Sequence, residues 1–71
     1  MLYEPSDVRA WARSMGQPVA VRGRLSYEVV VAYLIANPKV ARTLAVAHGL
    51  TVPARGRVGM ATCEELALLV R

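Results

Sequence analysis

The sequence predicts an all-α protein made of two tandem helix–loop–helix repeats, four short helices in total, that share one hydrophobic core. Of its 71 residues 55% are hydrophobic, so the chain is too apolar for a disordered tail and long enough only for one domain or two very small modules. Apolar residues recur at helical spacing between glycine and proline breaks. An internal repeat with a period of 33 residues gives both halves a similar pattern.

The repeat is clearest over residues 9–24 and 42–57, where seven of sixteen positions are identical. Both copies contain an Arg-Gly-Arg tripeptide, Arg22-Gly23-Arg24 and Arg55-Gly56-Arg57. Further on, Ser26-Tyr27-Glu28 matches Thr62-Cys63-Glu64 only at an offset of 36. We therefore expect three extra residues within Gly59-Met60-Ala61, in a longer second loop, because loops tolerate insertions. The predicted repeats are residues 1–36 and 37–71.

The first predicted helix begins after Ser6, a good N-cap, and ends at Gly16, which suits a left-handed C-cap. Its apolar face is formed by residues at helical spacing, Val8, Trp11, Ala12 and Met15. Residues 17–24 contain Pro18 and Gly23, which predicts an extended loop. Ser26 then caps a second helix that runs to about Ala36.

The second predicted helix is apolar on every side from Val29 to Ala36. A helix with no polar face is normally buried, and one module of about 30 residues cannot cover it. We expect this helix to be the central element, in contact with both repeats, and a second subunit is a further candidate to cover it.

The second repeat begins at Asn37, which can cap a third helix, with Pro38 suited to its first position. That helix runs to His48, where Gly49 stops it, and its apolar face is Val40, Leu44 and Ala47. Thr62-Cys63-Glu64-Glu65 fits a capping box, which predicts the start of a last helix that ends near Val70.

The charge pattern predicts a polyanionic partner. The net charge is +4, and residues 8–57 hold eight cations and the single acid Glu28. A concentrated positive field attracts nucleic acid, although a merely basic, well-solvated surface has the same composition. Arg9, Arg13 and Arg42 are candidate phosphate contacts, with ordinary helix-surface charge as the alternative.

The sequence predicts neither an enzyme nor a cofactor or metal site. One histidine, His48, and one cysteine, Cys63, make no disulfide and no metal-ligand set, and no nucleophile–base pair is apparent. Cys63 is expected to be a small core residue, and Trp11 a core residue packed with Tyr27 and Tyr33. The single cysteine, and an N-terminus without a basic segment followed by an apolar one, predict a cytoplasmic protein without membrane attachment.

The tripeptides predict insertion into the minor groove of A·T-rich DNA. That groove is narrow and strongly negative, and it attracts guanidinium groups. Two arginines can point in opposite directions along its floor, and the glycine between them lets the backbone approach the bases. The expected partner is therefore A·T-rich double-stranded DNA. The alternative for each tripeptide is a solvated turn whose glycine is chosen for its dihedral angles.

The first half resembles a known family. The residues that carry the likeness are Val8 to Gly16 (VRAWARSMG), then Val19, Arg22-Gly23-Arg24-Leu25, Glu28-Val29-Val30 and Tyr33. They resemble the DNA-binding domain of the actinobacterial Lsr family of nucleoid-associated silencers, functional analogues of H-NS. The resemblance implies that Arg22, Gly23 and Arg24 enter the minor groove in an AT-hook-like mode. Those silencers carry an N-terminal oligomerisation domain, and we expect this chain to be a free-standing tandem protein, a small phage-type or nucleoid-associated regulator of transcription.

The second half is similar to two families. It resembles the same silencer domain more weakly, with Leu44 in place of the tryptophan. Residues 41–50 and the segment Thr62–Leu66 also look like a peripheral-subunit-binding domain. The competing hypothesis is therefore a protein-interaction module, an adaptor or antagonist, that uses the apolar helices and the second repeat to bind a host protein or a second copy of the chain.

Overall fold

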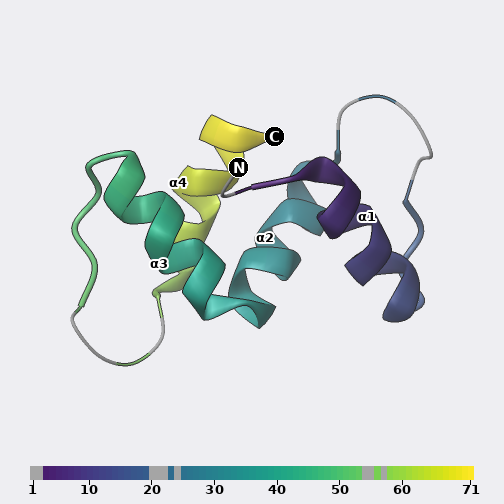
Figure 1. Cartoon of the computed structure of the whole chain (residues 1–71), viewed down its shortest axis with the longest axis horizontal. Coiled ribbons are helices and arrows are strands. Elements are labelled where there is room, and N and C mark those ends of the chain that lie inside the picture. Colours follow the sequence, from purple (N-terminus) through teal and green to yellow (C-terminus); the bar gives the residue numbers. More distant parts are fainter. Residues whose placement is uncertain (1–2, 20–22, 24, 54–55, 57) are drawn as a thin grey trace.

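A computed structural model of the chain describes residues 3–19, 23, 25–53, 56 and 58–71. These residues form four helices and no strand: α1 (Pro5–Ser14), α2 (Tyr27–Ala36), α3 (Pro38–Ala47) and α4 (Met60–Val70) (Figure 1). The prediction of an all-α fold with four short helices is confirmed. The molecule is elongated, with extents of 34 × 20 × 19 Å.

α2 is the central element, as predicted. It packs against each of the other three helices, with α1 toward one end of the molecule and α3 and α4 toward the other (Figure 1). Its side chains Val29, Val30 and Leu34 are buried, whereas Ile35 and Ala36 at its C-terminal end are exposed. The all-round apolar composition of α2 therefore reflects its contacts with three neighbours.

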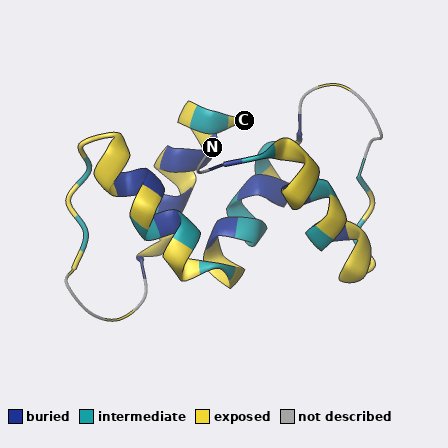
Figure 2. Cartoon of the chain, in the orientation of Figure 1, coloured by how far each residue is buried: buried dark blue, intermediate teal, exposed yellow. Residues whose placement is uncertain are grey.

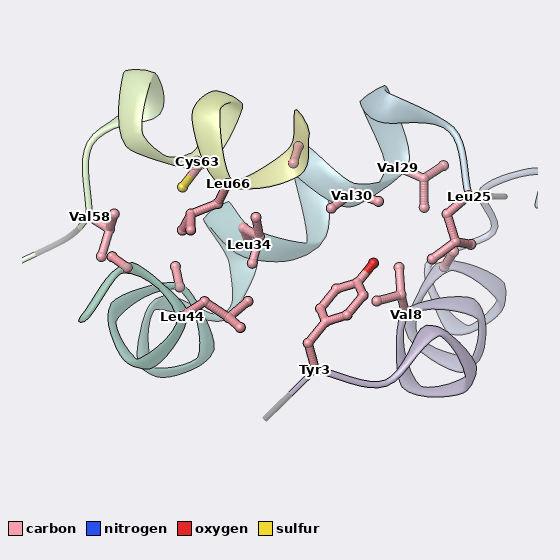
Figure 3. Packing of buried hydrophobic residues seen from close by; sticks show 14 residues of the cluster. Tyr3, Val8, Leu25, Val29, Val30, Leu34, Leu44, Val58, Cys63 and Leu66 are labelled. Carbon is pink, nitrogen blue, oxygen red and sulfur yellow. The ribbon is translucent and has the colours of Figure 1, made fainter. Parts of the chain in front are cut away.

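The core is one cluster of apolar side chains contributed by all four helices. Figure 2 shows the buried residues on the surfaces that face α2, with exposed residues on the outside. The largest fully buried side chains are Leu34, Leu66, Val8, Val30 and Cys63 (Figure 3). Cys63 is thus the core residue that the sequence predicted, and burial raises the pKa of its thiol.

α1 and α3 end in the same backbone motif. The amides of Gln17 and Leu50 donate to the carbonyls of Ala12 and Ala45, at 2.9 and 2.8 Å. These are the long hydrogen bonds of a Schellman motif, which needs a left-handed residue just beyond the C-cap. Glycine occupies that position in both motifs, with φ of 74° at residue 16 and 75° at residue 49. The predicted helix ends are confirmed.

The helix starts differ from several predictions. α1 begins at Pro5 with Glu4 as its N-cap, so the start after Ser6 was wrong; proline's fixed φ suits the first helical position. Ser26 caps α2 as predicted, and its Oγ accepts a hydrogen bond of 3.3 Å from the Val29 amide. Asn37 stands at the N-cap of α3, but its side-chain amide donates to the Tyr33 carbonyl at 2.8 Å.

The prediction of a capping box at Thr62 and of a longer second loop was wrong. α4 already begins at Met60, with Gly59 as its N-cap, so Thr62 lies inside the helix. The two loops, residues 15–26 and 48–59, have the same length of twelve residues. The period of 33 therefore continues into the last helix, where Cys63 is buried like Val30. Ser26 and Thr62 are similar residues in different structural positions.

Two residues placed on apolar faces are exposed. Met15 is 61% exposed because it is the C-cap of α1, where the helix turns into the loop. Ala47 is the last residue of α3 and is also exposed. In both cases the helical spacing of apolar residues in the sequence extends to the end of the helix, where the side chains no longer contact the core.

Candidate nucleic-acid interface

The Arg-Gly-Arg tripeptides lie in the two interhelical loops, one in residues 15–26 and the other in residues 48–59. The arginines of both tripeptides, Arg22, Arg24, Arg55 and Arg57, lie outside the described residues. Their central residues, Gly23 and Gly56, are described, and both are exposed to solvent. The two loops belong to opposite ends of the long axis of the molecule (Figure 1).

Each tripeptide is centred on a glycine in a conformation that other residues avoid. φ is 88° at Gly23 and 87° at Gly56. A Cβ at either position would meet no described atom within 4 Å. Internal crowding therefore does not require glycine. The positive φ is what favours glycine at these positions. Because glycine has no side chain, another molecule can approach the backbone of Gly23 and Gly56 closely.

Apolar residues attach the ends of both loops to the core. Leu25 and Val58, which follow the tripeptides directly, are 6% and 7% exposed, and Figure 3 shows them at opposite ends of the cluster. Val19 and Val52, which precede the tripeptides, are partly buried against the same core. Burial on both sides of each tripeptide fixes where the loops leave and re-enter the fold.

Two arginines from the helices bind the backbone of these loops. The Arg9 guanidinium, on α1, donates to the Gly23 carbonyl. Arg42, on α3, donates to the equivalent Gly56 carbonyl through one nitrogen and to the Pro53 carbonyl through another. Sequence reasoning missed these bonds. The signal was the identity of residues 9 and 42 within the repeat, each fourteen positions before the tripeptide glycine.

The predicted phosphate contacts differ in their surroundings. Arg13 is exposed in the last turn of α1. Arg9 and Arg42 are partly buried and hydrogen-bonded to loop carbonyls. A guanidinium has five N–H donors, so a hydrogen bond to a carbonyl leaves further donors on the same group. Phosphate binding by the three residues stays a prediction.

A comparison with protein-family models assigns the first half of the chain. Residues 3–36 match the model of the Lsr2 DNA-binding domain. This segment, just under half of the chain, is similar to an Lsr2 DNA-binding domain. The match confirms the family that the sequence resembled and supports a DNA-binding, nucleoid-associated protein. Searches of curated proteins and of solved structures give no match.

The matched segment comprises α1, the first Arg-Gly-Arg loop and α2, and therefore includes the Arg9–Gly23 hydrogen bond. Trp11 of this segment packs edge-on against Tyr33, with ring centroids 5.7 Å apart and an interplanar angle of 76°. That contact supports a structural role for Trp11, as predicted, because the ring is engaged within the fold.

Tyr27 connects the matched segment to the second half of the chain. Its hydroxyl lies close enough to Glu64 on α4 for the two side chains to interact. Desolvation, followed by the Glu64 charge, raises the pKa of Tyr27. The start of α2 is thus joined to α4 by a polar contact as well as by the core.

The described residues contain no group of three or more His, Cys, Asp or Glu side chains that could hold a metal ion. In the same part of the chain, no single helix is long and apolar enough to cross a membrane. α2 and α3 together reach that length and composition, with a bend of 109° between them.

Proposed function

We propose that the protein binds A·T-rich DNA by inserting Arg-Gly-Arg into the minor groove. The observation that carries the proposal is the conformation of Gly23 within the segment that matches the Lsr2 DNA-binding domain: exposed, at positive φ, with no described atom where a side chain would project. A backbone segment with a glycine at its centre can approach the floor of a narrow groove closely, because no Cβ stands in the way. The flanking Arg22 and Arg24 then supply the charge and the donors.

The chemistry of arginine favours A·T-rich sequence. Guanidinium groups are planar and weakly hydrated, and the negative potential of a narrow A·T minor groove attracts them. In that groove A·T and T·A pairs present only acceptors, whereas G·C pairs add an amino group. The expected selectivity is therefore for A·T-rich shape, without discrimination among A·T sequences.

The proposal extends to the second tripeptide, Arg55, Gly56 and Arg57. Gly56 is exposed like Gly23 and has a φ within one degree of it, and the two loops have the same length. Arg9, Arg13 and Arg42 would add affinity through phosphates without adding sequence information. A protein of this kind would act as a small nucleoid-associated or phage-type regulator of transcription.

One observation favours a second candidate function, a protein-interaction module. Val46 on α3 and the consecutive residues Leu68 and Leu69 on α4 are 66%, 64% and 52% exposed. Large apolar side chains in contact with water mark surfaces that bind proteins when they form a continuous patch. A second copy of the chain or a host protein could use them, and such binding is compatible with DNA binding by the loops.

A binding comparison tests the proposal. Fluorescence anisotropy of the full chain with an A·T-rich hairpin and a G·C-rich hairpin of equal length, at physiological salt, should give at least about tenfold tighter binding to the A·T-rich hairpin. Affinity should fall steeply as salt rises, because phosphate contacts release counterions. A small ligand that fills the A·T minor groove should displace the protein.

Equal affinity for the two hairpins would exclude A·T selectivity, and binding that the groove-filling ligand leaves unchanged would exclude minor-groove insertion. Absence of binding to either hairpin, together with self-association that is lost in Val46→Ser and Leu68→Ser, would favour the protein-interaction module.

A further inference from the structure

Arg42, in the second half of the chain, forms hydrogen bonds to the backbone of a loop. The Arg42 guanidinium extends from α3 to the loop that follows and donates to the carbonyls of both Pro53 and Gly56. The same nitrogen-to-glycine bond joins Arg9 to Gly23 in the first half. Two arginines at equivalent positions of α1 and α3 thus bind the equivalent loop carbonyl.

We propose that Arg42 is a positioning residue that presets the second Arg-Gly-Arg loop for the minor groove, through its hydrogen bonds to Pro53 and Gly56. The proposal rests on the proposed function and deepens it. Pro53 lies two residues before the tripeptide and Gly56 is its central residue. One planar guanidinium therefore fixes the distance between these two carbonyl oxygens of the loop.

The geometry of a guanidinium suits this task. Its N–H groups form a rigid fork, so two different nitrogens can serve two carbonyls at once. Lysine has one nitrogen at the end of a flexible chain and cannot reproduce the fork, although it keeps the charge and still binds phosphate. An Arg42→Lys variant therefore separates positioning of the loop from phosphate contact.

Positioning matters because an exposed loop loses conformational freedom when it enters a groove. Fixing the backbone in advance lowers that entropic cost and raises the affinity. The Gly56 carbonyl is also held by a cation on the protein, which offsets its partial negative charge next to the DNA backbone. Both effects require Arg42 to act through the loop, whether or not it touches DNA.

The test isolates the second loop. In the full chain carrying Arg22→Ala and Arg24→Ala, the remaining A·T-selective binding belongs to the second loop. Adding Arg42→Lys should weaken binding to the A·T-rich hairpin by about tenfold, with the salt dependence unchanged. The matched control is Lys39→Arg, on the exposed surface of α3, which should leave the affinity unchanged. Circular dichroism should show the same helix content and melting temperature for all these variants.

A second measurement reports on the loop directly. The ¹⁵N relaxation order parameter of Gly56 should fall in Arg42→Lys, while that of Gly23 stays constant. Arg9→Lys in a chain carrying Arg55→Ala and Arg57→Ala should give the reciprocal result.

The outcomes distinguish the two proposals. If the unsubstituted chain shows no preference for A·T-rich DNA, the proposed function fails. If that preference is present but disappears in Arg22→Ala/Arg24→Ala, the second loop is no binding site and the inference about Arg42 is overturned. If the second loop binds and Arg42→Lys leaves both the affinity and the Gly56 order parameter unchanged, positioning by Arg42 is overturned.

Discussion

Replacing the four tripeptide arginines, Arg22, Arg24, Arg55 and Arg57, with alanine should abolish A·T-selective DNA binding. Each hydrogen bond from a charged donor is worth about 1.5–3 kcal/mol, so losing the two in one loop should weaken that site by about a hundredfold or more. Anisotropy titrations with the A·T-rich hairpin would measure the loss. The fold should be unaffected, because the core consists of other residues.

A charge-preserving variant is the control for this experiment. Lysine at the same four positions keeps the net charge at +4, so non-specific, salt-dependent binding should persist. The A·T preference should fall, because lysine lacks the planar, weakly hydrated guanidinium. Undiminished A·T-selective binding by the alanine variant would contradict the proposed role of the tripeptides.

Leu34→Ala should unfold much of the protein near its normal working temperature. Leu34 is fully buried on α2, the helix that contacts all the others. Truncating a buried leucine costs about 2–5 kcal/mol. A chain of this length has a total stability of only about 4–10 kcal/mol. Thermal denaturation followed by circular dichroism should therefore show a melting temperature lower by about 10–30 °C.

Leu68→Ala is the matched control, because Leu68 lies on α4 and is 64% exposed. Its melting temperature should stay close to that of the unsubstituted chain. Both loops should lose DNA binding together as Leu34→Ala unfolds, since both are attached to the same core. A Leu34→Ala chain that melts like the Leu68→Ala chain would show that α2 is not the centre of the fold.

The helix ends were predictable from sequence because they depend on local chemistry. Gly16 and Gly49 are the only described residues at the ends of α1 and α3 with positive φ, and glycine is the residue that adopts that conformation readily. Ser26 was recognisable as an N-cap because its hydroxyl oxygen can accept a hydrogen bond from a backbone amide of the first helical turn. The central place of α2 also followed from composition, because a helix without a polar face needs neighbours on several sides.

The start of α4 was not predictable from its capping signal. Thr62 and Glu65 have the spacing of a capping box, but the helix begins at Met60, 33 residues after the start of α2. The Gly59 carbonyl already accepts a hydrogen bond of 3.1 Å from the Cys63 amide, so the first turn closes three residues before the turn that Thr62 could have capped.

The arginine-to-loop hydrogen bonds required the three-dimensional structure. Arg9 and Arg42 have the sequence pattern of surface cations on helices, and the identity of their partners depends on how each loop returns to the core at Leu25 and Val58. Sequence reveals that residues 9 and 42 are equivalent. It does not reveal that a backbone carbonyl fourteen residues further on lies within reach.

The most direct test of minor-groove insertion is a titration of the ¹⁵N-labelled full chain with an A·T-rich hairpin, followed by amide chemical shifts. The account predicts that the largest shifts occur at Gly23 and Gly56, with smaller ones at the first turns of α2 and α4. Unmoved glycine amides, with shifts concentrated at Val46, Leu68 and Leu69 on α3 and α4, would contradict it.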